Sequence, residues 1–234
     1  MFLDELRKHA TEAAPDEACG LVVARGKKVR IIRARNLAEE PQKHFDLDTD
    51  AWLEVQAHEE VIGIYHSHPH GSAKPSEADL SACEASGLPW HIVGSGGDYQ
   101  LVNPSGYRAP YARRPYVYGV HDCYSLARDW FLWECGIALP DYRRHQDRKQ
   151  NRFLERYEES GFARLVDAPA QRGDLMLVQV DSPVPNHCAV YLGDGTVLHH
   201  VEGRLSTRDP WGGYWVKHCC THLRHNSLSG NNNG

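Results

Sequence analysis

The stretch from Val61 to Asp79 constrains the amino-terminal half of this chain more than any other part of the sequence. Val61 to Tyr65 is a short apolar run with β-branched residues, and a loop rich in glycine and proline follows it. The run therefore predicts a buried strand. His66 and His68 stand at its end, where residues two apart project to the same side. The sequence thus places two imidazoles together at the mouth of a loop.

Two adjacent imidazoles suit a zinc ion, and Asp79, near the start of a helix expected over residues 78–85, can supply a third ligand. Three protein ligands leave one coordination position open, which is typical of a catalytic zinc rather than a structural one. The alternative is that a chain with 15 histidines contains this spacing by accident. The complete pattern, His-x-His-x7-Ser-x2-Asp, is specific enough to favour the metal site.

A second segment agrees, and together the two resemble the JAMM (MPN+) metalloprotease motif. Pro15 to Gly20 precedes an apolar run and is similar to that family's Pro-x-Glu-x-x-Gly approach to its first core strand. The resemblance covers roughly residues 1–100. It implies that the three residues above are zinc ligands. It also implies that Glu17 is the general base toward water and that Ser76 hydrogen-bonds the oxyanion.

Composition narrows the classes of partner. The length of 234 residues is compatible with one large or two small domains, and 41% hydrophobic content lets each half bury a core. A net charge of -5 without a Lys/Arg block argues against nucleic acid or an anionic membrane as partner. No apolar run approaches the roughly 18 residues that span a bilayer. Acidic residues within 1–13 predict an amphipathic helix there and no signal peptide.

The domain organisation follows from the pattern of elements. Alternating helix and strand signals through residue 102 predict a mixed α/β sheet, with strands near 21–24, 29–34, 61–65, 89–93 and 99–102. Near Asn103 the character changes, because prolines and tyrosines without periodicity predict an ordered linker. We therefore predict one domain over residues 1–105 and a second over 106–226. The polar tail, residues 227–234, is expected to be disordered.

The second domain carries its own candidate site around Cys123. Asp122 is a good N-cap, so Cys123 lies in the first turn of a helix, where backbone N–H groups lower the pKa of a thiol. Residues 186–199 predict a hairpin with a tight Asp-Gly turn. His187 and His199 would then lie near each other on paired strands, so that one is base to Cys123 and the other orients it. The alternative, a buried structural thiol, does not account for the two histidines.

These pieces resemble the NlpC/P60 papain-like peptidases over about residues 108–225. The matching features are Asp-Cys-x-Ser at the helix start, Arg-Gly-Asp-Leu before a strand, and the spacing of the two histidines. The resemblance implies a papain-like α+β domain in which Cys123 is the nucleophile, His187 the base and His199 the orienting residue. It also implies that Tyr116 lines the site. His200 is an alternative third residue.

Two features depart from the pattern of this second family. The loop before Cys123 is short, and Arg172 stands where proline is common, so the substrate cleft could differ. The histidines and cysteines from His218 to His225 suggest another metal cluster, but the stretch that begins at Tyr214 is better explained as a terminal strand. The seven cysteines are odd in number and dispersed, which predicts free thiols rather than a disulfide framework.

The order of the two domains resembles the tail tip assembly protein K family of lambda-like tailed phages. The resemblance implies a two-site peptidase with a zinc cofactor, peptidoglycan stem peptides as a substrate, and other tail tip proteins as partners, a ubiquitin-like assembly protein among them. It implies a location in the host cytoplasm during assembly and in the virion tail tip afterwards. Two alternatives stay open. One is an assembly factor with one or both sites inactive, and the other is a host peptidase of ubiquitin-like sulfur carriers or wall peptides.

Overall fold

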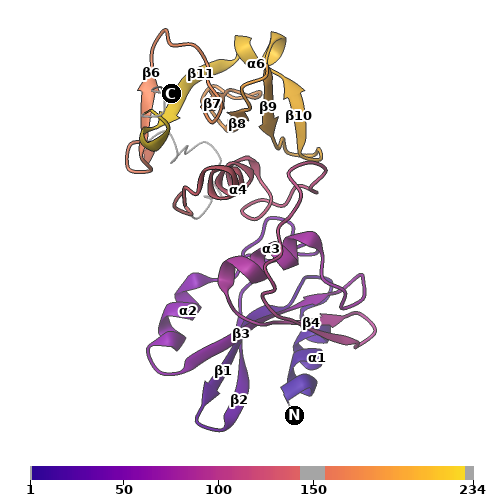
Figure 1. The fold of residues 1–234 in the computed structure, drawn as a ribbon. Coiled ribbons are helices and arrows are strands. Elements are labelled where there is room, and N and C mark those ends of the chain that lie inside the picture. Colours follow the sequence, from indigo (N-terminus) through magenta and orange to yellow (C-terminus); the bar gives the residue numbers. More distant parts are fainter. Residues whose placement is uncertain (1, 143–155, 230–234) are drawn as a thin grey trace. The chain divides into compact units, whose positions relative to one another are not determined.

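The chain divides into two compact units, Met1–Ala109 and Pro110–Gly234 (Figure 1). The computed structural model describes residues 2–142 and 156–229. Within these residues, no helix combines the length and the apolar character that crossing a bilayer requires. Each unit is built on its own β-sheet.

The amino-terminal unit is a mixed five-stranded sheet with strand order β2-β1-β3-β4-β5. The strands are β1 (Cys19–Arg25), β2 (Lys28–Ala34), β3 (Glu60–His68), β4 (Trp90–Gly94) and β5 (Tyr99–Val102). Only β3 and β4 run parallel. The helices are α1 (Phe2–Ala13), α2 (Thr49–Gln56) and α3 (Glu77–Ser86). The mixed α/β fold predicted for this half is confirmed.

Strand alternation sorts the core of this unit into two clusters. Leu21 and Ile64 pack in a cluster with side chains of α2 and α3. Val22 and Tyr65, one residue further along each strand, pack in another cluster with Leu6 of α1. Because successive strand residues point to opposite faces, His66 and His68 lie on the same side of β3 as Ile64, the side of α3. This alternation carries both histidines at the end of β3 toward that helix.

Gly20 is the position in β1 where a side chain does not fit. A Cβ there would lie 2.1 Å from the carbonyl oxygen of Ile32 and 2.6 Å from the ring of Tyr65. We expect Gly20→Ala to lower the free energy of unfolding of this unit by roughly 1–3 kcal/mol, because backbone or core must shift. Urea unfolding measures the loss. Gly71→Ala is the control, since its Cβ would meet nothing within 4 Å. Equal stability of the two variants would contradict the prediction.

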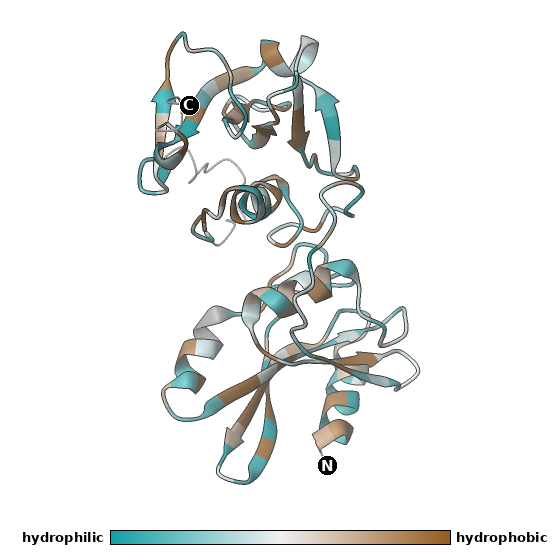
Figure 2. Ribbon diagram, in the orientation of Figure 1, coloured by the Kyte–Doolittle hydropathy of each residue, from teal (hydrophilic) through white to brown (hydrophobic). Residues whose placement is uncertain are grey.

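The carboxyl-terminal unit is an antiparallel sheet with strand order β10-β9-β8-β7-β11-β6. Its strands are β6 (Phe162–Leu165), β7 (Leu175–Val178), β8 (His187–Tyr191), β9 (Thr196–His199), β10 (Thr207–Pro210) and β11 (Cys219–His225). Helix α4 (Cys123–Cys135) packs against it through Leu126, Trp130 and Phe131. Figure 2 shows that β9 is apolar and the edge strand β10 polar. The predicted α+β arrangement is confirmed.

A buried carboxylate ties the middle of this sheet together. Asp174 is fully buried and accepts hydrogen bonds from Arg224 Nε at 2.7 Å and from His222 Nε2 at 2.6 Å. The backbone N–H of Gln171 donates to the same carboxylate at 2.6 Å. His222, one member of the cluster between residues 218 and 225, is therefore engaged in a structural hydrogen bond.

Two segments differ from the expectation drawn from sequence. Tyr214 to Val216 lie in a short helix, α6 (Gly213–Lys217), and the terminal strand begins only at Cys219. The expected disordered tail starts too early, because Asn226–Leu228 forms a 3-10 helix, η1, and Leu228 packs against the core. Leu228 is the one apolar residue that holds this turn against the core, and because its neighbours are polar the composition of the segment predicts disorder. The rest of the predicted tail, residues 230–234, lies outside the described residues.

Candidate active sites

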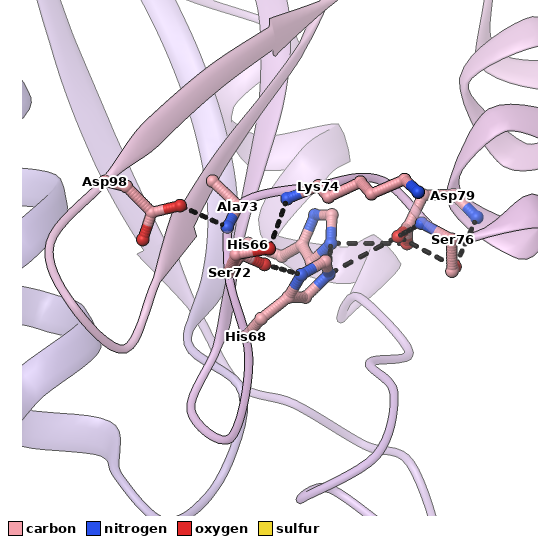
Figure 3. A network of polar contacts seen from close by, with 8 residues as sticks. All are labelled: His66, His68, Ser72, Ala73, Lys74, Ser76, Asp79 and Asp98. Carbon is pink, nitrogen blue, oxygen red and sulfur yellow. Dashed lines mark hydrogen bonds and ion pairs between the residues drawn. The ribbon is translucent and has the colours of Figure 1, made fainter.

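Three side chains converge where β3 ends and α3 begins (Figure 3). His66 is buried and His68 is partly exposed, and their Nε2 atoms lie 3.0 Å apart. Asp79, in the first turn of α3, places Oδ1 3.2 Å from Nε2 of His66 and Oδ2 3.3 Å from Nε2 of His68. The structure thus brings the three predicted ligands together.

The separations fit a tetrahedral metal ion. Bonds of about 2.0–2.1 Å to zinc in a tetrahedron place ligand atoms about 3.3 Å apart. Ring lone pairs and carboxylate oxygens this close repel one another unless a cation or shared protons lie between them. Two imidazoles and a carboxylate are also a donor set that zinc prefers, and three ligands leave a position open. The residues present fit the ion.

The loop after β3 fixes the orientation of His68. Its Nδ1 lies 2.8 Å from the carbonyl oxygen of Ser72. Because a carbonyl only accepts, Nδ1 carries a proton, and Nε2 is the ring nitrogen that faces the site. Asp98 holds the same loop by accepting a hydrogen bond from the backbone N–H of Ala73 at 2.7 Å. On the other side, the ring of Phe45 stacks on His66 with centroids 4.8 Å apart.

Ser76 is the N-cap of α3 and holds the Asp79 carboxylate. Its backbone N–H donates to Asp79 Oδ2 at 2.7 Å, and its hydroxyl donates to the same oxygen at 2.8 Å. Burial acts to raise the pKa of Asp79, but the charge of His66 and the hydrogen bonds from both histidines outweigh it and hold the pKa well below its usual range. The resemblance to the JAMM motif implies that Ser76 contacts an oxyanion, whereas in this structure its hydroxyl contacts the carboxylate of Asp79.

Glu17 lies close enough to His68 and Asp79 for their charges to act on its carboxyl. Its neighbour Ala18 donates its N–H to Ser67 Oγ and accepts from the N–H of Ser67, both at 2.9 Å, which fixes the chain next to the two histidines. Glu17 is buried, and burial raises the pKa of its carboxyl to about 8; the charges of His68 and Asp79 act on it as well. A carboxyl with a raised pKa can hold a proton near neutral pH, as a general acid–base group must.

In the other unit, Cys123 is the first residue of α4. The N-cap, Asp122, accepts hydrogen bonds from the N–H of Ser125 at 2.8 Å and of Gly119 at 3.0 Å. A hydrogen bond with Cys188, together with the hydrogen bond and charge of His187, lowers the pKa of Cys123 well below that of an ordinary thiol, against the opposing effect of burial. A thiol with a lowered pKa can act as a nucleophile.

The two histidines of the hairpin meet as the sequence predicts. Nε2 of His187 lies 3.0 Å from Nδ1 of His199, and both residues are buried. Burial and the charge of His187 lower the pKa of His199 to about 4, with Asp209 opposing the shift. His199 therefore carries a single ring proton at neutral pH. His200 instead directs Nε2 to the carbonyl oxygen of Arg204 at 3.2 Å, so the geometry favours His199 as the third residue.

Two further residues singled out from the sequence, Tyr116 and Arg172, contact neighbours within the same unit. The ring of Tyr116 meets His200 edge to face, with centroids 5.1 Å apart. Arg172 pairs with Glu134 of α4 at 2.9 Å, and its guanidinium lies over the ring of Trp130. The residue that replaces the common proline therefore braces the turn before β7 against α4.

Three residues that contact the cysteine or its histidines were not predicted as part of a site. Cys188 contacts Cys123, and the only signal for it is that it follows His187 in the chain. Asp209 lies 3.1 Å from Nε2 of His199. The ring of Trp215, from α6, stands edge-on to His199 at 4.4 Å between centroids. Asp209 and Trp215 reach His199 through the placement of β10 and α6, which no short sequence motif predicts.

Known proteins are similar to this chain in both of its domains. The family model for prokaryotic homologs of the JAB domain matches residues 2–107, and the NlpC/P60 family model matches residues 113–224. Tail tip assembly protein K of Escherichia phage N15 is 36% identical over 98% of this chain and 96% of its own. The protein of that name from Escherichia phage lambda is 34% identical over 76% and 89%. A Thermus thermophilus protein described as a probable TtuB-protein conjugate cleaving protease is 33% identical over 45% and 74%.

Proposed function

Because this chain belongs to the tail tip assembly protein K family, with a JAB domain and an NlpC/P60 domain in that order, we propose that it is a peptidase with two independent active sites. The observation that carries the proposal is that each domain gathers a complete set of reactive side chains. One set is the three ligand atoms beside Glu17, and the other is Cys123 with its pair of histidines.

In the amino-terminal site, His66, His68 and Asp79 would hold zinc, which when bound supplies Lewis acidity to the reaction. Glu17 takes a proton from the attacking water and returns it to the leaving amine, a task that a carboxyl with a raised pKa can perform. Ser76 keeps the Asp79 carboxylate in place. We assign this site to an isopeptide or peptide bond that follows a ubiquitin-like domain. The description of the Thermus relative as a conjugate-cleaving protease supports this assignment.

In the carboxyl-terminal site, the Cys123 thiolate attacks the carbonyl carbon of the substrate and a carbon–sulfur bond forms. His187 gives its proton to the leaving amine, so that the carbon–nitrogen bond breaks and a thioester remains. His187 then takes a proton from water, which attacks the thioester and releases the carboxylic acid and the thiol. His199 orients His187, and Tyr116 lines the approach for the substrate. The substrate class we assign is the γ-D-glutamyl–diamino acid bond of peptidoglycan stem peptides.

Family membership supports a proposal for the partners and the location. We propose that the protein acts with other proteins of a phage tail tip, one of them a ubiquitin-like tail assembly protein. It would work in the host cytoplasm during assembly and then at the virion tail tip. The competing function is that of an assembly factor whose sites are inactive. Cleavage assays with selective inhibitors distinguish a peptidase from such a factor.

Selective inhibition tests the two sites in one preparation. We expect the purified protein to cleave both a stem tetrapeptide and a ubiquitin-fold protein joined through its carboxyl terminus to a lysine side chain. Iodoacetamide should stop cleavage of the stem peptide alone, because it alkylates Cys123, and a zinc chelator should stop cleavage of the conjugate alone. Mass spectrometry of the products measures both. Failure of the untreated protein to cleave either substrate would favour the assembly factor.

A further inference from the structure

His199 is engaged on both of its ring nitrogens. Nδ1 faces Nε2 of His187 at 3.0 Å, and Nε2 faces a carboxylate oxygen of Asp209 at 3.1 Å. The strand register explains this line of three side chains. His199 pairs with Ala189 on β8 and with Thr207 on β10, so His187 and Asp209 are its diagonal neighbours on either side. Diagonal neighbours lie on one face of a sheet, within reach of long and aromatic side chains.

The chemistry of the outer partner determines which ring atoms carry protons. A carboxylate at neutral pH accepts hydrogen bonds and donates none, so the proton of His199 lies on Nε2. Its Nδ1 is then a bare acceptor, and the facing Nε2 of His187 must donate to it. The other ring nitrogen of His187, Nδ1, is then unprotonated, and it is the one that remains to act as base toward Cys123.

We propose that Asp209 is a positioning residue that sets the tautomers of both His199 and His187, so that His187 presents a basic nitrogen to the thiol. This inference rests on the proposed cysteine peptidase function. It adds a carboxylate that touches neither thiol nor substrate and acts only through the two imidazoles. The order of groups across the sheet is then Cys123, His187, His199 and Asp209.

The surroundings of the imidazole pair support this role. The titratable side chains that act on His199 are His187 from β8, Asp209 from β10, and the adjacent His200. Trp215 covers the pair from α6, with its ring centroid 4.4 Å from that of His199, so that little water competes for the ring nitrogens. Arg208 is committed elsewhere, since its guanidinium pairs with Asp194 and donates to Thr196 Oγ1 at 2.9 Å.

Alkylation of Cys123 tests the proposal without a substrate. The rate of reaction with iodoacetamide is measured against pH by mass spectrometry of the peptide that contains Cys123. For Asp209→Ala we expect the pH midpoint to rise by about one unit and the rate at any pH below the midpoint of the unaltered protein to fall roughly tenfold, because the His187 imidazolium that pairs with the thiolate loses the support that Asp209 gives it through His199. Asp209→Glu keeps a carboxylate and should restore most of the rate. Asp194→Ala, which removes a carboxylate from the turn of the hairpin that carries both histidines, should leave the profile unchanged.

A second measurement needs no substitution. Nitrogen chemical shifts of the histidine rings in the unaltered full-length protein report the tautomers, and we expect protonated Nε2 in both His187 and His199. A His199 ring protonated on Nδ1 would overturn the proposal. So would an Asp209→Ala profile that overlays the unaltered one, or equal shifts for Asp209→Ala and Asp194→Ala. An ordinary thiol titration of Cys123 in the unaltered protein would instead overturn the cysteine peptidase function itself, and with it this inference.

Discussion

Cleavage of a stem tetrapeptide is expected to fall on the order of 10⁴-fold or more when Cys123 is replaced by alanine, because the thiolate is the atom that forms the covalent intermediate. The loss should appear in kcat, since the groups that bind the peptide stay in place. The measurement is the initial rate of release of the diamino acid fragment, followed by chromatography. Cleavage of the ubiquitin-fold conjugate by the same variant should be unchanged, since that reaction uses residues of the other domain.

Cys135 provides a matched control at the far end of the same helix. It is partly buried, and burial raises the pKa of its thiol, so it lacks the features that activate Cys123. Cys135→Ala should therefore cleave the stem peptide at the rate of the unaltered protein. Circular dichroism of both variants checks that α4 still packs on its sheet. Equal rates for Cys123→Ala and the unaltered protein would exclude this thiol as the nucleophile.

The two candidate sites share one structural principle. Each pairs two histidines from a sheet with an anionic group from the first turn of a helix: Asp79 in α3 and Cys123 in α4. The partial positive charge and free N–H groups at a helix start favour a carboxylate or thiolate there. In both cases a side-chain cap, Ser76 or Asp122, fixes where the helix begins. The cap thus determines the position of the reactive group.

This principle explains which parts of the sites are predictable from sequence. His66 and His68 project to the same side if the strand predicted over residues 61–65 extends as far as residue 68. Asp79 is placed correctly if a capped helix begins just before it. Cys123 depends on the same kind of local signal. His187 and His199 lie on the two strands of one hairpin, whose short turn sets their register. All of these residues are fixed by structure that forms within a few residues of them.

The parts that the sequence does not predict depend on contacts over longer distances. Asp209 reaches His199 only because β10 pairs with β9 in one register, and a shift by one residue would turn it to the other face. Trp215 reaches the histidines from α6, a five-residue helix in a stretch whose aromatic and β-branched residues favour a strand. Tertiary packing overrides that local preference, so neither residue could be assigned from a motif.

Zinc binding is the second property expected to change by a large factor. Asp79→Ala should lose stoichiometric zinc, with affinity on the order of 10²-fold weaker or worse, because even the loss of a residue that only orients a ligand costs 10–100-fold. Asp79→Asn should also lose zinc while it keeps an oxygen that can accept the capping hydrogen bonds of Ser76. Metal analysis after dialysis, together with competition by a chelator of known affinity, measures both variants.

Glu17→Gln separates the metal from the chemistry that it supports. Glu17 is outside the ligand group, so this variant should keep one zinc per chain and still lose cleavage of the conjugate, because an amide cannot take a proton from water. Glu77→Ala, an exposed acidic residue in the same first turn as Asp79, should retain both zinc and activity. If Asp79→Ala and Glu77→Ala bind zinc equally well, the convergence of His66, His68 and Asp79 does not form the metal site. If Glu17→Gln cleaves at the full rate, the proton is carried by another group.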